Sequence, residues 1–481
     1  MYRKCSFIIL SFLLCTPMLL ANTPKAAIKT NNQLVYEKQK SADTFSQMFS
    51  NGQFFGRIRS NTFLYTWEKE TAKQKNSLIS GLGGSAIYRS ARFQAFSFGA
   101  GLYYLHAFFN DSKYPVTTLN KGKDLLSRFD YVNTGSKDMA MLGQAYIDYK
   151  GIKNTKITVG RQLVETFYAK SNDTKMMPNT FDGVVLENAS LSATKIKLAY
   201  LAKQKLRDHT TAHSILMYGD ANSSSSLAPE WSENDDSAMH KGLTYTALKA
   251  AGVSTDAPLI TGDIHNTSIK NLKADFSFYY VPQLLSQTMG ELNYKINFTG
   301  FSITPGVRYI KQFDDKAGEI GGAAYNATAS SLAGYKNPNS LDSQMIAARV
   351  VCKINNYKIN LAYTKIFDEA DLITPWRGFP TGGYTRSMAR YNWQANTKSY
   401  RIEVVRNANK TGIYKNTFIQ ASILHTDADE NKGYFDENYY YLGFVQNPLD
   451  NLQWRLRLGY QDTKKVDADG LDSRLEFNYL F

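Results

Sequence analysis

Apolar and polar residues alternate with a period of two along much of this chain. Every second residue is apolar in 291–298 (ELNYKINF), and the same spacing occurs in 195–200 (KIKLAY), 357–364 (YKINLAYT) and 453–460 (QWRLRLGY). Successive side chains of a β-strand point to opposite faces, so each segment predicts a strand with one apolar and one polar face. An all-β fold is therefore expected.

The predicted connections alternate in length as well. Long polar stretches occupy 110–137 and 314–342, and the tight links lie at 90–92, 150–151, 270–271, 299–300, 355–356 and 449–451. Short turns at one end and long loops at the other are typical of a transmembrane antiparallel β-barrel of the bacterial outer membrane. We count about 18 strands from Gln53 to a last strand at 471–481. The connection from 205 to about 257 is too long for a compact soluble domain but acceptable on an extracellular rim.

Hydropathy excludes a bundle of membrane helices. After residue 21 there is no run of about 18 apolar residues, and the mean hydropathy is −0.37. Barrel strands need only about ten alternating residues, which such an average hides. A secreted soluble β-sandwich or solenoid is the competing fold, but its links would not alternate so regularly in length.

The two ends of the chain carry targeting signals. Arg3 and Lys4 precede an apolar stretch at 7–14, which predicts a signal peptide over 1–21, a periplasmic leader over 22–51 and a barrel over 52–481. Of the three cysteines, only Cys352 lies outside the predicted signal, so no internal disulfide is expected. At the other end, alternate residues from Leu475 to Phe481 are apolar, as in an outer-membrane assembly signal. We therefore expect outer-membrane lipid and, through Phe481, the assembly machinery as partners.

The chain is basic, with 56 Lys and Arg against 42 Asp and Glu. Only two of those basic residues lie in the predicted signal peptide, so the folded part carries the excess and anionic partners are expected. Strand parity points a series of arginines, suited to carboxylates and phosphates, into the barrel. These are Arg57, Arg59, Arg308, Arg349, Arg401, Arg455, Arg457 and Arg474. They form either a basic ladder for anions or ordinary interior ion pairs with acids such as Glu403 and Glu476.

Two blocks resemble the OprD family of outer-membrane porins. The more specific one contains Gly160-Arg161-Gln162 and continues to the PNTFDG segment at 178–183, and the other is WRGFP at 376–380. The resemblance implies an eighteen-stranded, substrate-selective channel in which a third loop (163–180) and a seventh loop (368–396) narrow the pore opposite the arginine ladder. It also implies that Arg161 faces this eyelet through a bulge, although alternation puts it on the lipid side. Lys175 stands where the family often has Arg.

Four acids lie in these two loops. They are Glu165, Asp173, Asp368 and Asp371. Opposite a basic wall, they would bind the ammonium end of an amino-acid-like solute. Alternatively, they are solvated loop charges or backbone caps.

Catalytic patterns are weak. His209 and His213 have a spacing that would suit a metal on a helix, but no third ligand is evident and the segment reads as loop. No Ser/His/Asp arrangement is visible either. Because an outer-membrane hydrolase needs one, this function ranks third, after the channel and the adhesin. We expect no enzyme activity, no metal or other cofactor, and no nucleic-acid partner because a signal peptide directs the chain out of the cytoplasm.

The sequence thus predicts a passive diffusion channel of the bacterial outer membrane. The solutes would be small, hydrophilic and anionic or zwitterionic. The family suggests carboxylate-bearing nutrients, but other members pass sugars or oligosaccharides, and the sequence does not choose between these classes. A non-conducting adhesin or structural barrel is the alternative, and both a monomer and a loose trimer are compatible with the sequence.

Overall fold

The computed structural model describes residues 26–28, 34–72, 74–114, 124–171, 173–220, 239–326 and 332–481. The predicted signal peptide, with Cys5 and Cys15, lies outside these ranges.

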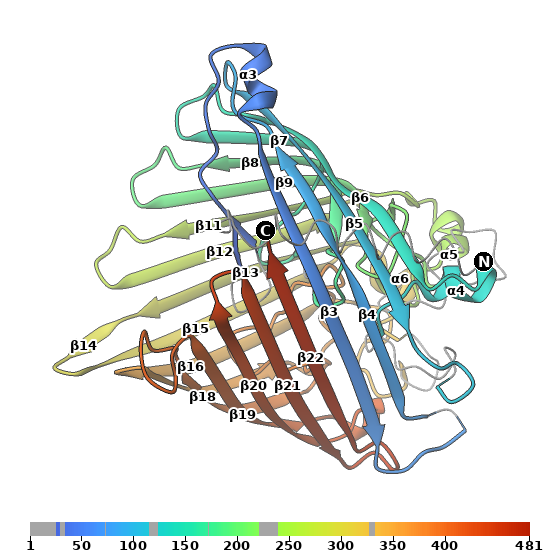
Figure 1. Cartoon of the computed structure of the whole chain (residues 1–481). Helices are drawn as coiled ribbons and strands as arrows, with labels where there is room; N and C mark the ends of the chain where they lie inside the picture. The colour runs from blue at the N-terminus through green and yellow to red at the C-terminus, as the bar shows by residue number, and fades with distance from the viewer. Residues whose placement is uncertain are drawn as a thin grey trace.

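A closed antiparallel barrel of 18 strands forms the body of the molecule (Figure 1). Its strands are β3 (Gln53–Trp67), β4 (Ser77–Arg89), β5 (Phe96–Phe108), β6 (Asp138–Tyr149), β7 (Thr155–Gln162), β8 (Thr180–Asn188), β9 (Thr194–Lys205), β11 (Leu259–Asn266), β12 (Leu272–Val281), β13 (Leu285–Tyr294), β15 (Phe301–Asp314), β16 (Ser343–Ile354), β17 (Tyr357–Ile366), β18 (Lys398–Arg406), β19 (Thr417–Asp427), β20 (Glu437–Leu449), β21 (Leu452–Thr463) and β22 (Gly470–Leu480). The short β14 (Ile296–Phe298) continues β13 along β15, and β10 (His213–Ser214) pairs with β9. The predicted fold and strand number are confirmed.

The barrel closes where its last strand meets its first. β22 pairs with β3 from Gly470↔Trp67 to Leu480↔Arg57. Closure leaves no sheet edge unpaired, which a membrane requires because lipid cannot hydrogen-bond the backbone. The two faces of the wall also alternate as predicted: in β18, Tyr400 and Ile402 are exposed outside, whereas Arg401 is buried inside.

Connections at the two ends of the barrel differ in length. At one end are tight turns such as 299–300, 355–356 and 450–451. At the other end are the long loops, which we name L3 (163–179), L4 (206–258), L6 (315–342), L7 (367–397) and L8 (428–436). The short helices at this end are α4 (Arg128–Thr134), α5 (Tyr245–Ala250), α6 (Ala317–Gly321) and η3 (Glu430–Lys432).

The segment before the barrel contains regular secondary structure. Helix α3 (Phe45–Ser50) begins at Thr44, whose side chain accepts a hydrogen bond from the Gln47 amide. Upstream, β1 (Ala26–Ile28) pairs with β2 (Leu34–Tyr36). No helix in the described ranges is long and apolar enough to cross a membrane.

One side of the barrel interior is filled by loops. Side chains of L3, L4, L6 and L7 form an apolar core against the inner faces of β8 to β17. Trp376 of L7 and Tyr168 of L3 are fully buried there, and both rings contact Tyr279 of β12, at 5.1 and 4.9 Å between centroids. The loops are therefore packed into the barrel and do not simply cover it.

Candidate functional site

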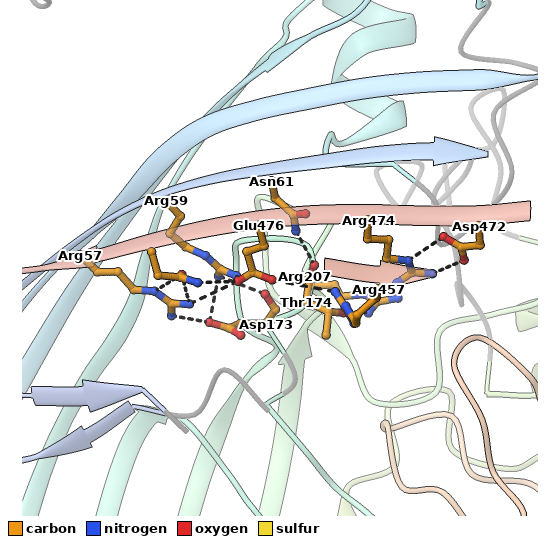
Figure 2. A network of polar contacts seen from close by, with 11 residues as sticks. Arg57, Arg59, Asn61, Asp173, Thr174, Arg207, Arg457, Asp472, Arg474 and Glu476 are labelled. Carbon is orange, nitrogen blue, oxygen red and sulfur yellow. Dashed lines mark hydrogen bonds and ion pairs between the residues drawn. The ribbon is translucent and has the colours of Figure 1, made fainter. Parts of the chain in front are cut away.

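L3 crosses the barrel interior and is held by two arginines of the first strand (Figure 2). Asp173 accepts hydrogen bonds from Nη1 of Arg57 at 2.9 Å and from Nη1 of Arg59 at 3.0 Å. Both arginines are buried, and they face the same way because two positions separate them in a strand. Charge-assisted contacts of this kind are among the stronger hydrogen bonds in proteins. Strand β3 thus fixes the middle of L3.

A second layer of polar groups supports this contact from β22. Glu476 accepts a hydrogen bond from Nη2 of Arg59 at 2.5 Å, and Asn478 accepts from Nε of Arg57 at 2.9 Å. On the loop side, the carbonyl of Thr174 accepts from the Asn61 amide at 3.0 Å. Figure 2 shows these groups converging from β3, β22 and L3. The two guanidinium groups are therefore held in fixed orientations at the wall.

L3 and L7 also contact each other directly. The Lys170 amide donates to the carbonyl of Trp376 at 2.9 Å, and Ala169 forms a bridge with Arg377. A Cβ atom on Gly378 would lie 2.5 Å from the carbonyl oxygen of Tyr168, so a larger residue would force the two loops apart. The WRGFP block therefore belongs to the junction between the two loops.

Between these loops and the opposite wall lies a cavity of about 1020 Å³. Nine arginines, four lysines and two acids of the described residues line it. The basic ones are Arg57, Arg207, Arg377, Arg386, Arg390, Arg401, Arg455, Arg457, Arg474, Lys170, Lys197, Lys241 and Lys465, and the acids are Glu165 and Asp173. Such an excess of positive charge attracts anions.

Arg455 and Arg457 are the wall arginines with the least neutralisation by acids. Nε and Nη1 of Arg455 have no hydrogen-bond partner among the described residues, and Arg457 comes only within 3.9 Å of Glu476. By contrast, Arg474 donates two hydrogen bonds to Asp472, and Arg401 pairs with Glu403. The two guanidinium groups on β21 therefore have the most capacity left to bind an anion.

L7 supplies cations that strand parity does not reveal. Arg386 and Arg390 lie in the loop and line the cavity, and Arg390 forms an ion pair with Glu437 of β20 at 3.0 Å. Burial is the largest cause that lowers the pKa of Arg386 to about 10, and repulsion by Arg377, Arg401 and Arg207 adds to it. Of the L7 arginines Arg377, Arg386 and Arg390, only Arg377 carries a sequence signal, because it lies in the WRGFP block. Loop residues have no fixed period, so their direction depends on how the loop folds.

Arg308 and Arg349 differ from the ladder arginines that line the cavity, which are Arg57, Arg401, Arg455, Arg457 and Arg474. Arg308 pairs with Glu291 and donates from Nη1 to the L7 carbonyls of Pro380 at 2.6 Å and Gly382 at 2.9 Å. Arg349 donates to the Glu291 carboxylate at 2.9 Å. Both point inward as predicted, but neither lines the cavity. In this structure they hold L7 against the wall.

Arg161 lies outside the barrel interior, contrary to the prediction. In the neighbouring strands β6 and β8, the residues opposite Arg161 are Ala145 and Asp182. The register of β7 runs without a shift from Ile157 to Arg161. Arg161 therefore shares the outer face with Val159, where it donates to both carboxylate oxygens of Asp182 at 2.7 Å. The predicted bulge is absent from β7, so the orientation toward an eyelet is wrong.

The four predicted loop acids divide into two pairs. Glu165 and Asp173 line the cavity. Burial is the main cause that raises the pKa of Glu165 above its ordinary value. Asp368 instead forms ion pairs with Lys336 and Lys432 at 2.7 Å each, away from the cavity.

Asp371 joins three loops in a buried cluster. Its carboxylate accepts hydrogen bonds from the hydroxyls of Tyr335 in L6 and Tyr434 in L8, each at 2.7 Å, and from the L7 amide of Ala395 at 2.8 Å. Burial raises its pKa, and these hydrogen bonds oppose the rise. Asp371 therefore acts as a structural acceptor at the junction of the loops.

Replacement of Asp371 by asparagine should loosen L7. The amide nitrogen cannot accept a hydrogen bond, and each lost bond to a charged acceptor is expected to weaken the cluster by about 1.5–3 kcal/mol. Limited proteolysis of the folded barrel should cut the loops faster than in the parent. The exposed Asp256→Asn in L4 serves as the control, and equal cleavage rates in all three proteins would contradict the role.

His209 and His213 lie side by side in L4. Nδ1 of His209 is 2.7 Å from Nε2 of His213, and both rings are buried. Within the described ranges, no group of three potential ligands is placed to hold a metal ion. The prediction that this spacing does not signal a metal site stays a prediction.

The fold and the basic interior define a class, an outer-membrane porin with inward-folded loops. The family model described as "outer membrane porin, OprD family" matches residues 137–413, which is more than half of the chain. The chain therefore belongs to the OprD family, a family of outer-membrane channels, and its location is the bacterial outer membrane.

Solved structures agree on the fold. OpdK from Pseudomonas aeruginosa is similar with a TM-score of 0.67 and 10% identity, over 90% of this chain and 99% of that one. OccAB4 from Acinetobacter baumannii has a TM-score of 0.68 and 14% identity, over 89% and 98%. Another OpdK structure contains vanillate and has a TM-score of 0.65 and 10% identity, over 90% and 99%. No curated protein matches the chain.

Proposed function

We propose that this porin conducts small hydrophilic solutes bearing a carboxylate down their concentration gradient, through a constriction between L3, L7 and the wall of β18 to β22 and β3. The observation that carries the proposal is the cavity, lined by thirteen basic side chains and two acids. A solute carboxylate would pass from one guanidinium to the next. Each guanidinium group can donate two parallel hydrogen bonds to a carboxylate, and none of them binds the carboxylate alone.

The two acids define the solute further. Glu165 lines the cavity, and its carboxylate lies 3.9 Å from Nζ of Lys170. When the carboxylate of a zwitterion binds the basic wall, its ammonium group could pair with Glu165. Amino-acid-like zwitterions therefore fit as well as simple carboxylates. Vanillate, present in the OpdK structure, is itself a carboxylate, which agrees with this class of solute.

Partners other than solute follow from the class. The outer wall requires lipid, and the C-terminal Phe481 pairs with Gly56 through both backbone groups at 2.9 and 3.0 Å. An aromatic terminus at the closing seam fits recognition by the assembly machinery. We propose no catalytic role, and both a monomer and a loose trimer fit the channel.

The reversal potential under a salt gradient tests this function. The folded protein in a planar bilayer should give discrete current steps with a reversal potential on the anion side, because fixed positive charge concentrates anions in a narrow pore. Current steps with cation preference would overturn the carboxylate proposal, but the conclusion that the protein is an open channel would stand. A folded barrel without steps would favour the non-conducting adhesin.

A further inference from the structure

Helix α3 is fastened to the turn end of the barrel, outside its wall. The carbonyl of Met48 accepts a hydrogen bond from the Ala91 amide at 2.9 Å, and the Ala42 amide donates to the carbonyl of Arg92 at 2.8 Å. Both contacts are to the turn 90–95 between β4 and β5. In Figure 1 the helix lies at the end of the barrel that carries the short turns. Backbone contacts from within the helix and from just before it fix this position.

The helix has one buried and one exposed apolar side. Met48 is buried against the barrel. Phe45 and Phe49, one helical turn apart, keep 64% and 48% of their surfaces exposed. Their rings contact each other at 5.2 Å, and Phe45 also contacts Phe93 of the turn at 6.4 Å. Nothing in the described residues covers the outer side of this aromatic pair.

The exposed pair continues an aromatic belt on the lipid-facing wall. Phe49 contacts Phe98 of β5 at 5.4 Å between ring centroids, and Phe98 contacts Tyr88 of β4 at 5.7 Å. The Tyr88 hydroxyl donates to the carbonyl of Phe49 at 2.7 Å. Next along the wall, Phe96 contacts Tyr149 at 4.9 Å. Aromatic girdles of barrels lie at the membrane–water interface, so the helix is level with it.

We propose that α3 is an interfacial anchor that seats Phe45 and Phe49 in the phospholipid leaflet on the periplasmic side of the outer membrane. The short turns of such barrels face the periplasm, so the belt beside α3 meets that leaflet. Large apolar side chains left in water carry a cost that insertion removes, and amphipathic helices at an interface bind lipid in this way. The partner is thus a phospholipid, reached by surface continuous with the barrel's own lipid contact.

Quenching by spin-labelled lipid tests the anchor. The full chain, with Cys5, Cys15 and Cys352 replaced by serine, carries Phe45→Cys or Phe49→Cys labelled with an environment-sensitive fluorophore. It is folded into vesicles of phosphatidylethanolamine and phosphatidylglycerol, with or without a phospholipid bearing a nitroxide near the head of its acyl chain. The matched control is Ser46→Cys, exposed on α3 but rotated about 100° from Phe45 and about 60° from Phe49 around the helix. Phe96→Cys on the outer wall gives the quenching expected for full lipid contact.

Labels at positions 45 and 49 should be quenched roughly twofold more than the label at 46 and nearly as strongly as that at 96. Quenching no greater than at position 46 would overturn the anchor. Fluorescence at position 45 that changes with the density of protein in the vesicles, and not with the nitroxide lipid, would also overturn the anchor. It would indicate that a second copy of the chain covers this position. Heat-dependent gel mobility shows that each labelled barrel is folded, and the two helix positions test the anchor separately.

Discussion

Replacing both Arg455 and Arg457 by alanine is expected to lower the anion-to-cation permeability ratio about tenfold. These guanidinium groups line the cavity with little neutralisation by acids. A unit charge about 4 Å from a permeating anion contributes roughly 1 kcal/mol even in water and more in a narrow pore, and about 1.4 kcal/mol is a factor of ten. The reversal potential under a salt gradient measures the change.

A matched variant removes two charges outside the pore. Lys69→Ala with Lys153→Ala deletes exposed cations of a loop and a turn, neither of which lines the cavity. This control should keep the parent's selectivity. If it alters selectivity as much as the arginine pair does, net charge controls permeation; unchanged selectivity in the arginine variant would refute the ladder.

Asp173→Asn should act in the opposite direction and raise anion preference severalfold. Its carboxylate holds Arg57 and Arg59 at 2.9 and 3.0 Å, in the way a solute carboxylate would. The neutral amide frees one positive charge beside the cavity. It also weakens the tie between L3 and β3, because a neutral amide oxygen accepts weaker hydrogen bonds from the two guanidinium groups than a carboxylate does. Reversal potential and open-channel noise should therefore both rise.

Asp256→Asn, an exposed acid of L4 that does not line the cavity, is the control for Asp173→Asn. It should change neither quantity. A variant at Asp173 with more noise but the same selectivity would mean that the acid positions L3 without setting the charge of the pore. Fewer open steps and reduced conductance would contradict both parts.

The wall of the barrel could be predicted because its pattern is local. Alternation in 453–460 places Arg455 and Arg457 on the polar face, and the structure has both inside in β21. The lengths of the connections likewise predict which end of the barrel carries the long loops and which carries the tight turns. Arg386 and Arg390 lie in a loop, where no periodic pattern gives the direction of a side chain. Their orientation could therefore be read only from the folded structure of L7.

Arg161 shows where a motif misleads. The GRQ block supports membership of the family, which is confirmed, yet the side chain follows the alternation of β7 and lies outside. Local periodicity was the better guide there, since no register shift interrupts the strand. Asp371 shows the converse: its loop is evident from sequence, but its burial by Tyr335 and Tyr434 depends on three loops meeting.

The sequence by itself determined the strands, their inward and outward faces, and hence a basic interior, because side-chain direction in a strand depends only on the parity of position. Only the tertiary structure decided which arginines remain available to a solute. The Asp173 carboxylate pairs with Arg57 and Arg59 from more than one hundred positions away, and carbonyls of L7 accept hydrogen bonds from Arg308. Such pairings form where loops fold back into the barrel, and no local pattern encodes them.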